Sequence, residues 1–351
     1  MTPQGTRPRQ AHPVRTTRDL LLPASNADLL PAIVPMVADT NFLLSDALYS
    51  VAHDRVTAYQ RGLRSGSMRC FAARHVLPEL QKHLLRRARE RGLNVDQVIA
   101  RWQVRYAPFL RFVDVADCVP DDDRVRRVAT RHINDAPTAA LAVLLAPVHV
   151  LTEDPDLIDN GFGDRAWLVL TQAAGDLGAV DEAAMITIAG LTIAVNTTTA
   201  FIEQVRGSRL LQNVLLVAAG AIGALATTHR RRLPSLWQRF GWPLVESAGT
   251  IYFKQLERRR SATALLSATA VQPSTVELSQ DVSRLLAVAS APLTATAIAR
   301  AVWERQDGSP YRNTFREVRE LLTTNAAFVS VGRHGWTLGA PCIAALAPGD
   351  G

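Results

Sequence analysis

Four carboxylates in the first half of the chain each stand beside a short apolar segment and could together hold a divalent cation. They are Asp39, Glu79, Asp135 and Asp154. Hard cations such as Mg²⁺ and Mn²⁺ prefer carboxylate oxygens, so a set of acids with few histidines indicates a magnesium or manganese site and not a zinc site. A bound cation activates water and neutralises charge on a scissile phosphate. The residue types therefore predict metal-dependent phosphodiester hydrolysis, with these four acids as catalytic and metal-binding residues.

The segments around two of the acids predict buried strands that end in acid. Residues 32–38 are mostly apolar and lead directly to Asp39, whereas residues 148–151 lead through Thr152 to Asp154. Short apolar segments bounded by polar residues are typical of strands buried on both faces. Both acids are therefore expected at the carboxyl end of a strand.

The other two acids stand where helices are expected to begin. Glu79 follows Pro78 and precedes a basic amphipathic segment, and Asp135 precedes Pro137. Proline suits the first helical turn, and aspartate is a common N-cap residue. In an open parallel sheet, the carboxyl ends of strands face the same crevice as the amino ends of the following helices. All four acids are therefore expected to converge there.

The order and spacing of these motifs resemble PIN-domain nucleases, the group that includes the VapC toxins. The residues that carry the resemblance are Asp39-Thr40-Asn41, Glu79, Asn134-Asp135 and the segment Leu151 to Leu157. The resemblance spans residues 31–165, with an insertion between Arg91 and Arg111. It implies an α/β three-layer sandwich with a parallel sheet, an Mg²⁺ or Mn²⁺ cofactor and RNA as the substrate. By this analogy, the acidic quartet is joined by Asp156 as a further metal-binding acid and by Thr40, Asn41 and Thr152 as supporting polar residues.

Composition predicts several modules and anionic partners. A chain of 351 residues exceeds the usual size of one domain, and its formal net charge is +7. An excess of basic over acidic residues favours binding to nucleic acid or to an acidic membrane surface. Three widely separated cysteines indicate a reducing, cytoplasmic compartment and no zinc knuckle. Residues 1–30 are interpreted as a flexible basic tail, and a homo-oligomer is expected.

The middle of the chain, residues 166–260, is expected to be helical and hydrophobic. Residues 183–202 and 210–228 carry no charge, and a short charged loop separates them. Two interpretations fit this pattern. One is a membrane hairpin, which would attach the protein to the inner face of the membrane, and the other is a pair of buried helices in a bundle.

The C-terminal region predicts a winged helix-turn-helix over residues 277–340, after a linker over 261–276. Residues 282–289, 294–303 and 313–323 show helical apolar spacing, and 328–331 and 336–338 read as two strands. The pattern is similar to winged-helix domains of the HARE-HTH kind. The expected nucleic-acid contacts are Arg312, Asn313, Arg316 and Arg319 on the third helix and Arg333 on the wing. A protein partner at this module fits as well, because Glu317 and Glu320 interrupt the basic face.

The sequence thus predicts a metal-dependent endoribonuclease whose winged helix selects the substrate or a partner. Two alternatives stay open at this point. The acids of a non-catalytic adaptor would hold only a structural ion or nucleic acid, and a structure-specific nuclease would use the same chemistry on DNA.

Overall fold

The computed structural model describes residues 33–117, 121–164, 167–177, 254, 257–258, 260–273, 277–305 and 311–342. The chain divides into two compact units, of which the first joins residues 1–178 to 262–351 and the second covers 179–261. The expected tail over 1–30 and the uncharged stretches 183–202 and 210–228 lie outside the described residues. Within the described residues, every helix is too short or too polar to cross a bilayer. The first unit carries the architecture that follows.

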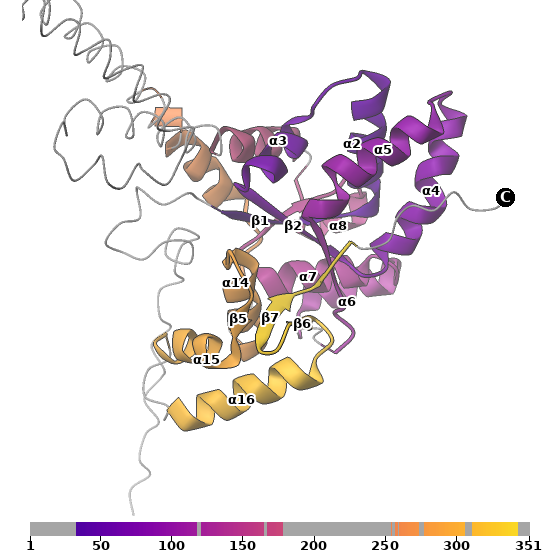
Figure 1. Cartoon of the computed structure of the whole chain (residues 1–351). Coiled ribbons are helices and arrows are strands. Elements are labelled where there is room, and N and C mark those ends of the chain that lie inside the picture. Colours follow the sequence, from indigo (N-terminus) through magenta and orange to yellow (C-terminus); the bar gives the residue numbers. More distant parts are fainter. Residues whose placement is uncertain are drawn as a thin grey trace, which may run out of the picture. The chain divides into compact units, whose positions relative to one another are not determined.

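The centre of the first unit is a mixed sheet of mostly parallel strands (Figure 1). Its strands are β1 (Val34–Ala38), β2 (Met68–Ala73), β3 (Leu110–Val113), β4 (His149–Leu151) and β8 (Ala340–Pro341). The order across the sheet is β4-β1-β2-β3-β8. The first four strands pair in parallel, and β8 is antiparallel to β3. The predicted parallel sheet is therefore confirmed, with one antiparallel strand added at its edge.

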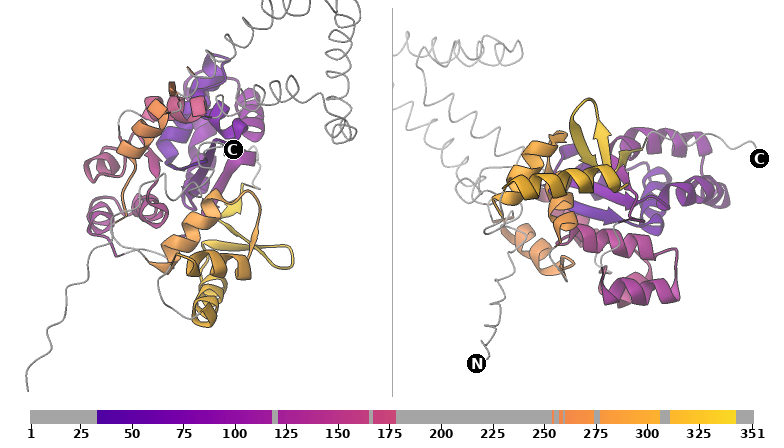
Figure 2. Two further views of the ribbon diagram at one scale, coloured as in Figure 1. Left: turned by 90° about the vertical axis from the view of Figure 1, so that its left-hand side faces the viewer. Right: turned by 90° about the horizontal axis from the view of Figure 1, so that it is seen from below.

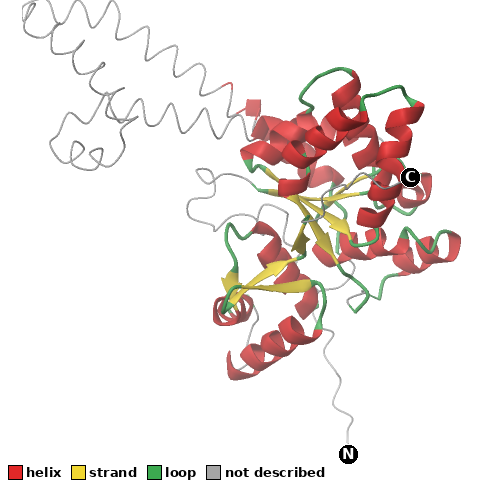
Figure 3. Cartoon of the chain, turned by 45° about the vertical axis from the view of Figure 1, so that its right-hand side comes forward, coloured by secondary structure: helices red, strands yellow, loops and turns green. Residues whose placement is uncertain are grey.

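Helices cover both faces of this sheet (Figure 3). They are α2 (Thr40–Ala52), α3 (Ala58–Ser65), α4 (Val76–Glu90), α5 (Val95–Arg105), α6 (Asp123–Arg131), α7 (Ala136–Leu145) and α8 (Pro155–Asp159). Alternate strand residues point to opposite faces, so Cys70 and Ala72 enter the core beneath α2 and α4, whereas Phe71 and Ala73 enter the core beneath α7. The segment predicted as an insertion contributes α5, whose Trp102 is fully buried.

The C-terminal region contains three helices and a small antiparallel sheet. The elements are α14 (Leu278–Val288), β5 (Leu293–Thr294), α15 (Ala295–Trp303), α16 (Tyr311–Thr324), β6 (Phe328–Val331) and β7 (Gly335–Leu338), and the sheet order is β5-β7-β6. The predicted three helices and two strands are confirmed. The two-residue strand β5 was not predicted, because so short a segment has no readable alternation.

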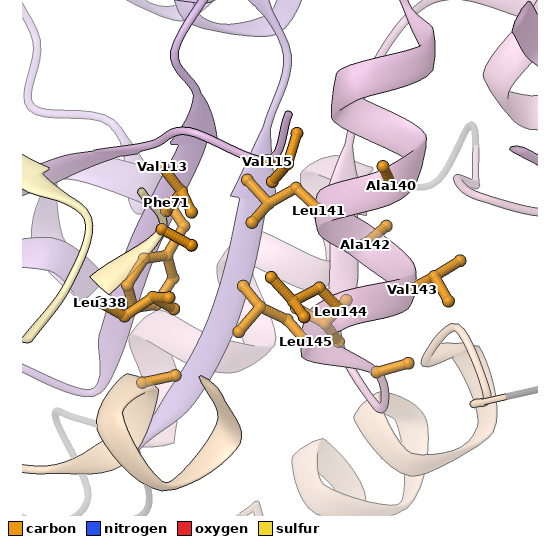
Figure 4. Close-up of a cluster of buried hydrophobic side chains, with 14 of the residues drawn as sticks. Phe71, Val113, Val115, Ala140, Leu141, Ala142, Val143, Leu144, Leu145 and Leu338 are labelled. Carbon is orange, nitrogen blue, oxygen red and sulfur yellow. The ribbon is translucent and has the colours of Figure 1, made fainter. Parts of the chain in front are cut away.

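The C-terminal region shares one hydrophobic core with the main sheet. Leu338 of β7 lies beside Phe71 of β2, and the leucines of α7 face the same core (Figure 4). The side chain of Gln280 on α14 donates to the Val143 carbonyl oxygen of α7 at 3.2 Å. Strand β8 then extends the main sheet beyond β3. The C-terminal elements and the α/β sheet are therefore parts of one packed body.

The segment predicted as a linker differs from that expectation in its first part. Residues 260–269 are helical, and Ala262 and Leu266 are buried in the core on the α2 side of the sheet. Val271 then exchanges backbone hydrogen bonds with Val148. Alanine, serine and threonine are typical of linkers, but here the few large apolar side chains of this segment find a place in the core.

A buried polar network ties the helices of the α2 face together. The carboxylate of Asp46 accepts hydrogen bonds from the Tyr106 hydroxyl at 2.7 Å and from the Thr57 hydroxyl at 3.0 Å. The Gln60 amide donates to the Tyr106 oxygen at 2.6 Å and to the Ser50 oxygen at 2.9 Å. Burial raises the pKa of Asp46 to about 6. Each donor in the network therefore offsets the cost of a buried carboxylate.

We expect Tyr106→Phe to lower the free energy of unfolding by about 1 to 3 kcal/mol, because it removes one of the two donors to the buried Asp46 carboxylate and one of the two acceptors of the Gln60 amide. Urea unfolding followed by circular dichroism measures the change. Tyr49→Phe is the matched control, since the Tyr49 side chain is half exposed. Equal stability of the two variants would show that the network does not stabilise the fold.

Candidate functional site

The candidate site lies at the carboxyl edge of the parallel sheet, between β1 and β4. The chain runs outward from β1 through β2 to β3 and then returns to the other side of β1 as β4. Such a reversal of strand order opens a crevice at the strand ends, where ligands of α/β proteins bind. The Asp39 backbone N–H donates to the Leu151 carbonyl oxygen at 3.0 Å, and the Thr152 hydroxyl donates to Asp39 Oδ2 at 3.2 Å. Asp39 and Thr152 are thus joined at this point.

Glu79 is connected to the same region through Thr40. The Thr40 hydroxyl, buried at the start of α2, donates to Glu79 Oε2 at 2.6 Å. Glu79 lies in the first turn of α4, as the sequence predicts. Thr40 therefore orients one carboxylate while its neighbour Asp39 contributes another. No side-chain hydrogen bond of Asn41 occurs within the described part of the chain.

Asp135 and Asp154 both occupy N-cap positions. Asp135 precedes α7, with Pro137 in the first turn, and its carboxylate forms no capping hydrogen bond. Asp154 precedes α8, and its Oδ1 accepts from the Asp156 backbone N–H at 2.7 Å. The Asp154 backbone N–H in turn donates to the Thr152 hydroxyl at 3.0 Å. Thr152 therefore orders Asp39 and Asp154 together.

The charges of these carboxylates act on one another. Burial, together with the charges of Asp135 and Asp154, raises the pKa of Asp39 from its ordinary 3.8 to about 6, against the lowering effect of the Thr40 amide and the Thr152 hydroxyl. The pKa of Asp135 also rises to about 6, first through burial and then through the charges of Asp154, Glu79 and Asp156. Mutual repulsion of this kind occurs only between carboxylates that share a site. All four predicted acids are thus brought into one electrostatic cluster.

Among the described residues, no basic side chain forms a salt bridge with the cluster, although the charge of His132 lowers the pKa of Asp135. No lysine, arginine or histidine there forms a salt bridge with Asp39, Glu79, Asp135 or Asp154. Nor do any three acid, histidine or cysteine side chains of the described part stand close enough to form a ready-made metal site. Neighbouring carboxylates raise one another's pKa, and a bound cation would offset that repulsion. The all-carboxylate donor set fits Mg²⁺ or Mn²⁺ in this respect.

Asp156, predicted as a further metal ligand, has basic partners instead. Its Oδ1 lies 3.3 Å from an Arg131 guanidinium nitrogen, and its Oδ2 lies 3.1 Å from His132 Nε2. Both basic residues come from the end of α6 and the loop before Asp135. These pairs anchor that loop to α8. Asp156 therefore differs from the quartet, since its charge is already compensated.

Two features of the same edge were not predicted from the sequence. Asp114 follows β3 and forms an ion pair of 2.8 Å with Arg74, which follows β2. The buried Nδ1 atom of His75 has no hydrogen-bond partner, and burial lowers the pKa of His75 while the charge of Glu79 opposes the shift. Asp114 was missed because strand β3 lay at the end of the assumed insertion. The short apolar group of Leu110, Phe112 and Val113 directly before Asp114 was its only signal.

The predicted nucleic-acid contacts are all exposed. They are Arg312, Asn313, Arg316, Arg319 and Arg333. The three arginines of α16 are spaced by four and three residues, so they form one stripe, beside a second stripe that contains Asn313, Glu317 and Glu320. Arg333 stands in the turn of the β6–β7 hairpin, which projects outward (Figure 2).

Comparisons with known proteins provide no relative from which a function could be transferred. No family model, curated protein or solved structure matches the chain. The chemistry of the acidic cluster and of the basic stripe is therefore the basis for assigning a function.

We expect the acidic cluster to make stability fall as pH rises. The folded state binds more protons than the unfolded state between pH 3.8 and about 6, since the pKa of Asp39 is raised. For this buried group the pKa shift corresponds to a destabilisation of the folded state by about 3 kcal/mol. This destabilisation is absent at low pH and fully present above pH 6. Without divalent cations, Asp39→Asn should therefore stabilise the fold at pH 7.5 and flatten the profile.

Thermal unfolding between pH 4.5 and 7.5 in chelator measures this effect. Asp159→Asn is the control, since Asp159 is an exposed acid on α8. If Asp39→Asn has the same pH dependence of melting temperature as the wild type, the Asp39 carboxylate does not destabilise the fold and the assignment is contradicted.

Proposed function

We propose that the chain is a metal-dependent endoribonuclease with a PIN-like α/β domain. The observation that carries this proposal is the buried Asp39 carboxylate at the reversal of strand order, coupled by charge to Asp135 and Asp154 and without a basic partner in the described part. Carboxylates with raised pKa values and no salt bridge are typical of functional sites, and this edge of an α/β sheet is where ligands bind. A positively charged ligand would balance their charge. A structural ion pair would have placed arginine or lysine there.

Asp39, Glu79, Asp135 and Asp154 would hold the cation in this proposal. A bound Mg²⁺ or Mn²⁺ would supply an activated water and neutralise charge on the scissile phosphate. The Thr152 hydroxyl forms hydrogen bonds with both the Asp39 carboxylate and the Asp154 backbone N–H, and the Thr40 hydroxyl donates to Glu79. These bonds orient the carboxylates. Asp156 contacts Arg131 and His132, and these contacts hold the loop before Asp135. In this proposal Asp156 has that role and is not a metal ligand.

We infer further that the C-terminal elements form a winged helix that contacts the RNA. Three helices with a β5-β7-β6 sheet give the order expected for that fold, with α16 as the third helix and the β6–β7 turn as the wing. The arginine stripe of α16 and Arg333 offer charge to a phosphate backbone. Packing against the α/β sheet gives this surface a fixed relation to the acidic edge.

We expect purified protein to cleave RNA with Mn²⁺ or Mg²⁺ and to be inactive in chelator. Asp39→Asn and Asp135→Asn should each lower the rate by about 10²- to 10³-fold, the loss typical of removing one preorganised electrostatic group. Asp159→Asn, an exposed substitution on α8, should retain wild-type rate. Cleavage of labelled single-stranded and hairpin RNA, resolved on denaturing gels, measures the rates.

The same assay separates the competing functions. Cleavage of flap DNA but not RNA, lost in the same variants, would replace the ribonuclease with a DNA nuclease. A third outcome is that no substrate is cleaved, but Mn²⁺ raises the melting temperature of the wild type and not of Asp39→Asn. This result would indicate a non-catalytic adaptor that binds an ion. Metal-independent cleavage would contradict the proposed site.

The basic stripe generates a separate expectation about salt. Arg316→Ala and Arg319→Ala should each weaken RNA binding to a similar extent for all sequences and lower the slope of log affinity against log salt by about one. Glu320→Ala on the neighbouring stripe is the control. Filter binding in chelator at several salt concentrations measures the slope. Unchanged slopes would favour a protein partner at this surface.

A further inference from the structure

A pocket of about 320 Å³ lies where the main sheet meets the C-terminal elements. Arg69 and Arg111 enter it from β2 and β3, near the amino ends of these strands and away from the acidic edge. Arg64, at the end of α3, lines it as well. Pro292 and Trp336 close it from the C-terminal side. All three cations thus face a cavity that belongs to both parts of the packed body.

The face on which these arginines lie follows from strand alternation. Arg69 shares its face with Phe71, and Arg111 shares its face with Val113, and both apolar residues belong to the core beneath α7 and α14. Phe71 and Arg111 are register partners, so the two arginines come from adjacent strands. Two strand positions on this face therefore carry positive charge at one end of the sheet, where apolar side chains occupy the rest of the face.

The positive charge is not balanced by the protein. Burial lowers the pKa of both Arg69 and Arg111, and the charge of Arg111 lowers that of Arg69 further. The Arg69 guanidinium donates to the carbonyl oxygens of Ala287 and Ala289. The Arg111 guanidinium has neither a hydrogen bond nor an ion pair within the described residues, and none of the residues that line the pocket is acidic. Half-burying a cation without a partner is costly, and an anion would offset that cost.

The walls indicate what kind of anion fits. Phe109 and Trp336 present aromatic surface, and Pro292 adds an apolar contact. The volume is at the lower end of the range for small-molecule sites, about 300 to 1,000 Å³. Guanidinium groups bind phosphate oxygens in a bidentate manner, and aromatic rings stack on planar rings.

We propose that this pocket binds a nucleoside phosphate, with the phosphate on Arg64, Arg69 and Arg111 and the base against Phe109 and Trp336. Bound there, the ligand would touch β2 and β3 on one side and the loop before β5 on the other, so it would hold the two parts of the chain together. The site is independent of the acidic edge and needs no divalent cation.

Isothermal titration calorimetry of the full chain in chelator tests the proposal, because chelator removes any metal-bridged binding at the acidic edge. The probes are AMP, ADP, GMP and inorganic phosphate. We expect a nucleotide to bind more tightly than inorganic phosphate. Arg111→Met should weaken it at least about tenfold, the value of one hydrogen bond to a charged group. Arg111 suits this test because it supports no other side chain in the described part.

Arg64→Ala is a second variant on an exposed helix end, and Arg89→Met, an exposed substitution on α4, is the matched control that should bind normally. Circular dichroism checks that each variant is folded. Absence of binding by all four probes at millimolar concentration would overturn the proposal. Equal affinity for inorganic phosphate would overturn the nucleoside assignment, and binding unaffected by both Arg111→Met and Arg64→Ala would overturn the location.

Discussion

The burial of the Asp39 carboxylate between the ends of β1 and β4 is the constraint on which the site depends. A carboxylate in this position is costly, and only two hydroxyl or amide donors offset the cost. The parallel pairing of β1 with β4 places Thr152 beside it, and α7 brings Asp135 within electrostatic reach. The four parallel strands thus bring separate acids into one cluster. A bound cation would offset the repulsion between these carboxylates.

The continuous core between the sheet and the C-terminal elements makes the first unit one packed body. Leu338 packs against the sheet, Gln280 bonds to α7, and β8 lengthens the sheet itself. Interfaces between independent domains are usually smaller and more polar. The arginine stripe on α16 therefore belongs to the same packed body as the acids.

Opposite charges occupy opposite ends of the same sheet. The acids follow the carboxyl ends, whereas Arg69 and Arg111 lie near the amino ends. Four residues of strand span about 13 Å, which exceeds the screening length of about 8 Å at physiological salt. The two groups therefore do not neutralise each other, and each retains an uncompensated field that a ligand of the opposite sign can satisfy.

The sequence by itself determined the local elements and the positions of the acids on them. The strand before Asp39, the helix starts at Glu79 and Asp135, and the three C-terminal helices were all readable, because apolar periodicity and proline placement are local signals. Tertiary structure alone decided what depends on distant contacts. It paired Asp156 with bases, packed residues 260–269 into the core although their composition is that of a linker, and joined β8 to β3. It also brought Arg69 and Arg111 into one pocket, since their 42-residue separation becomes adjacency only when β2 and β3 pair.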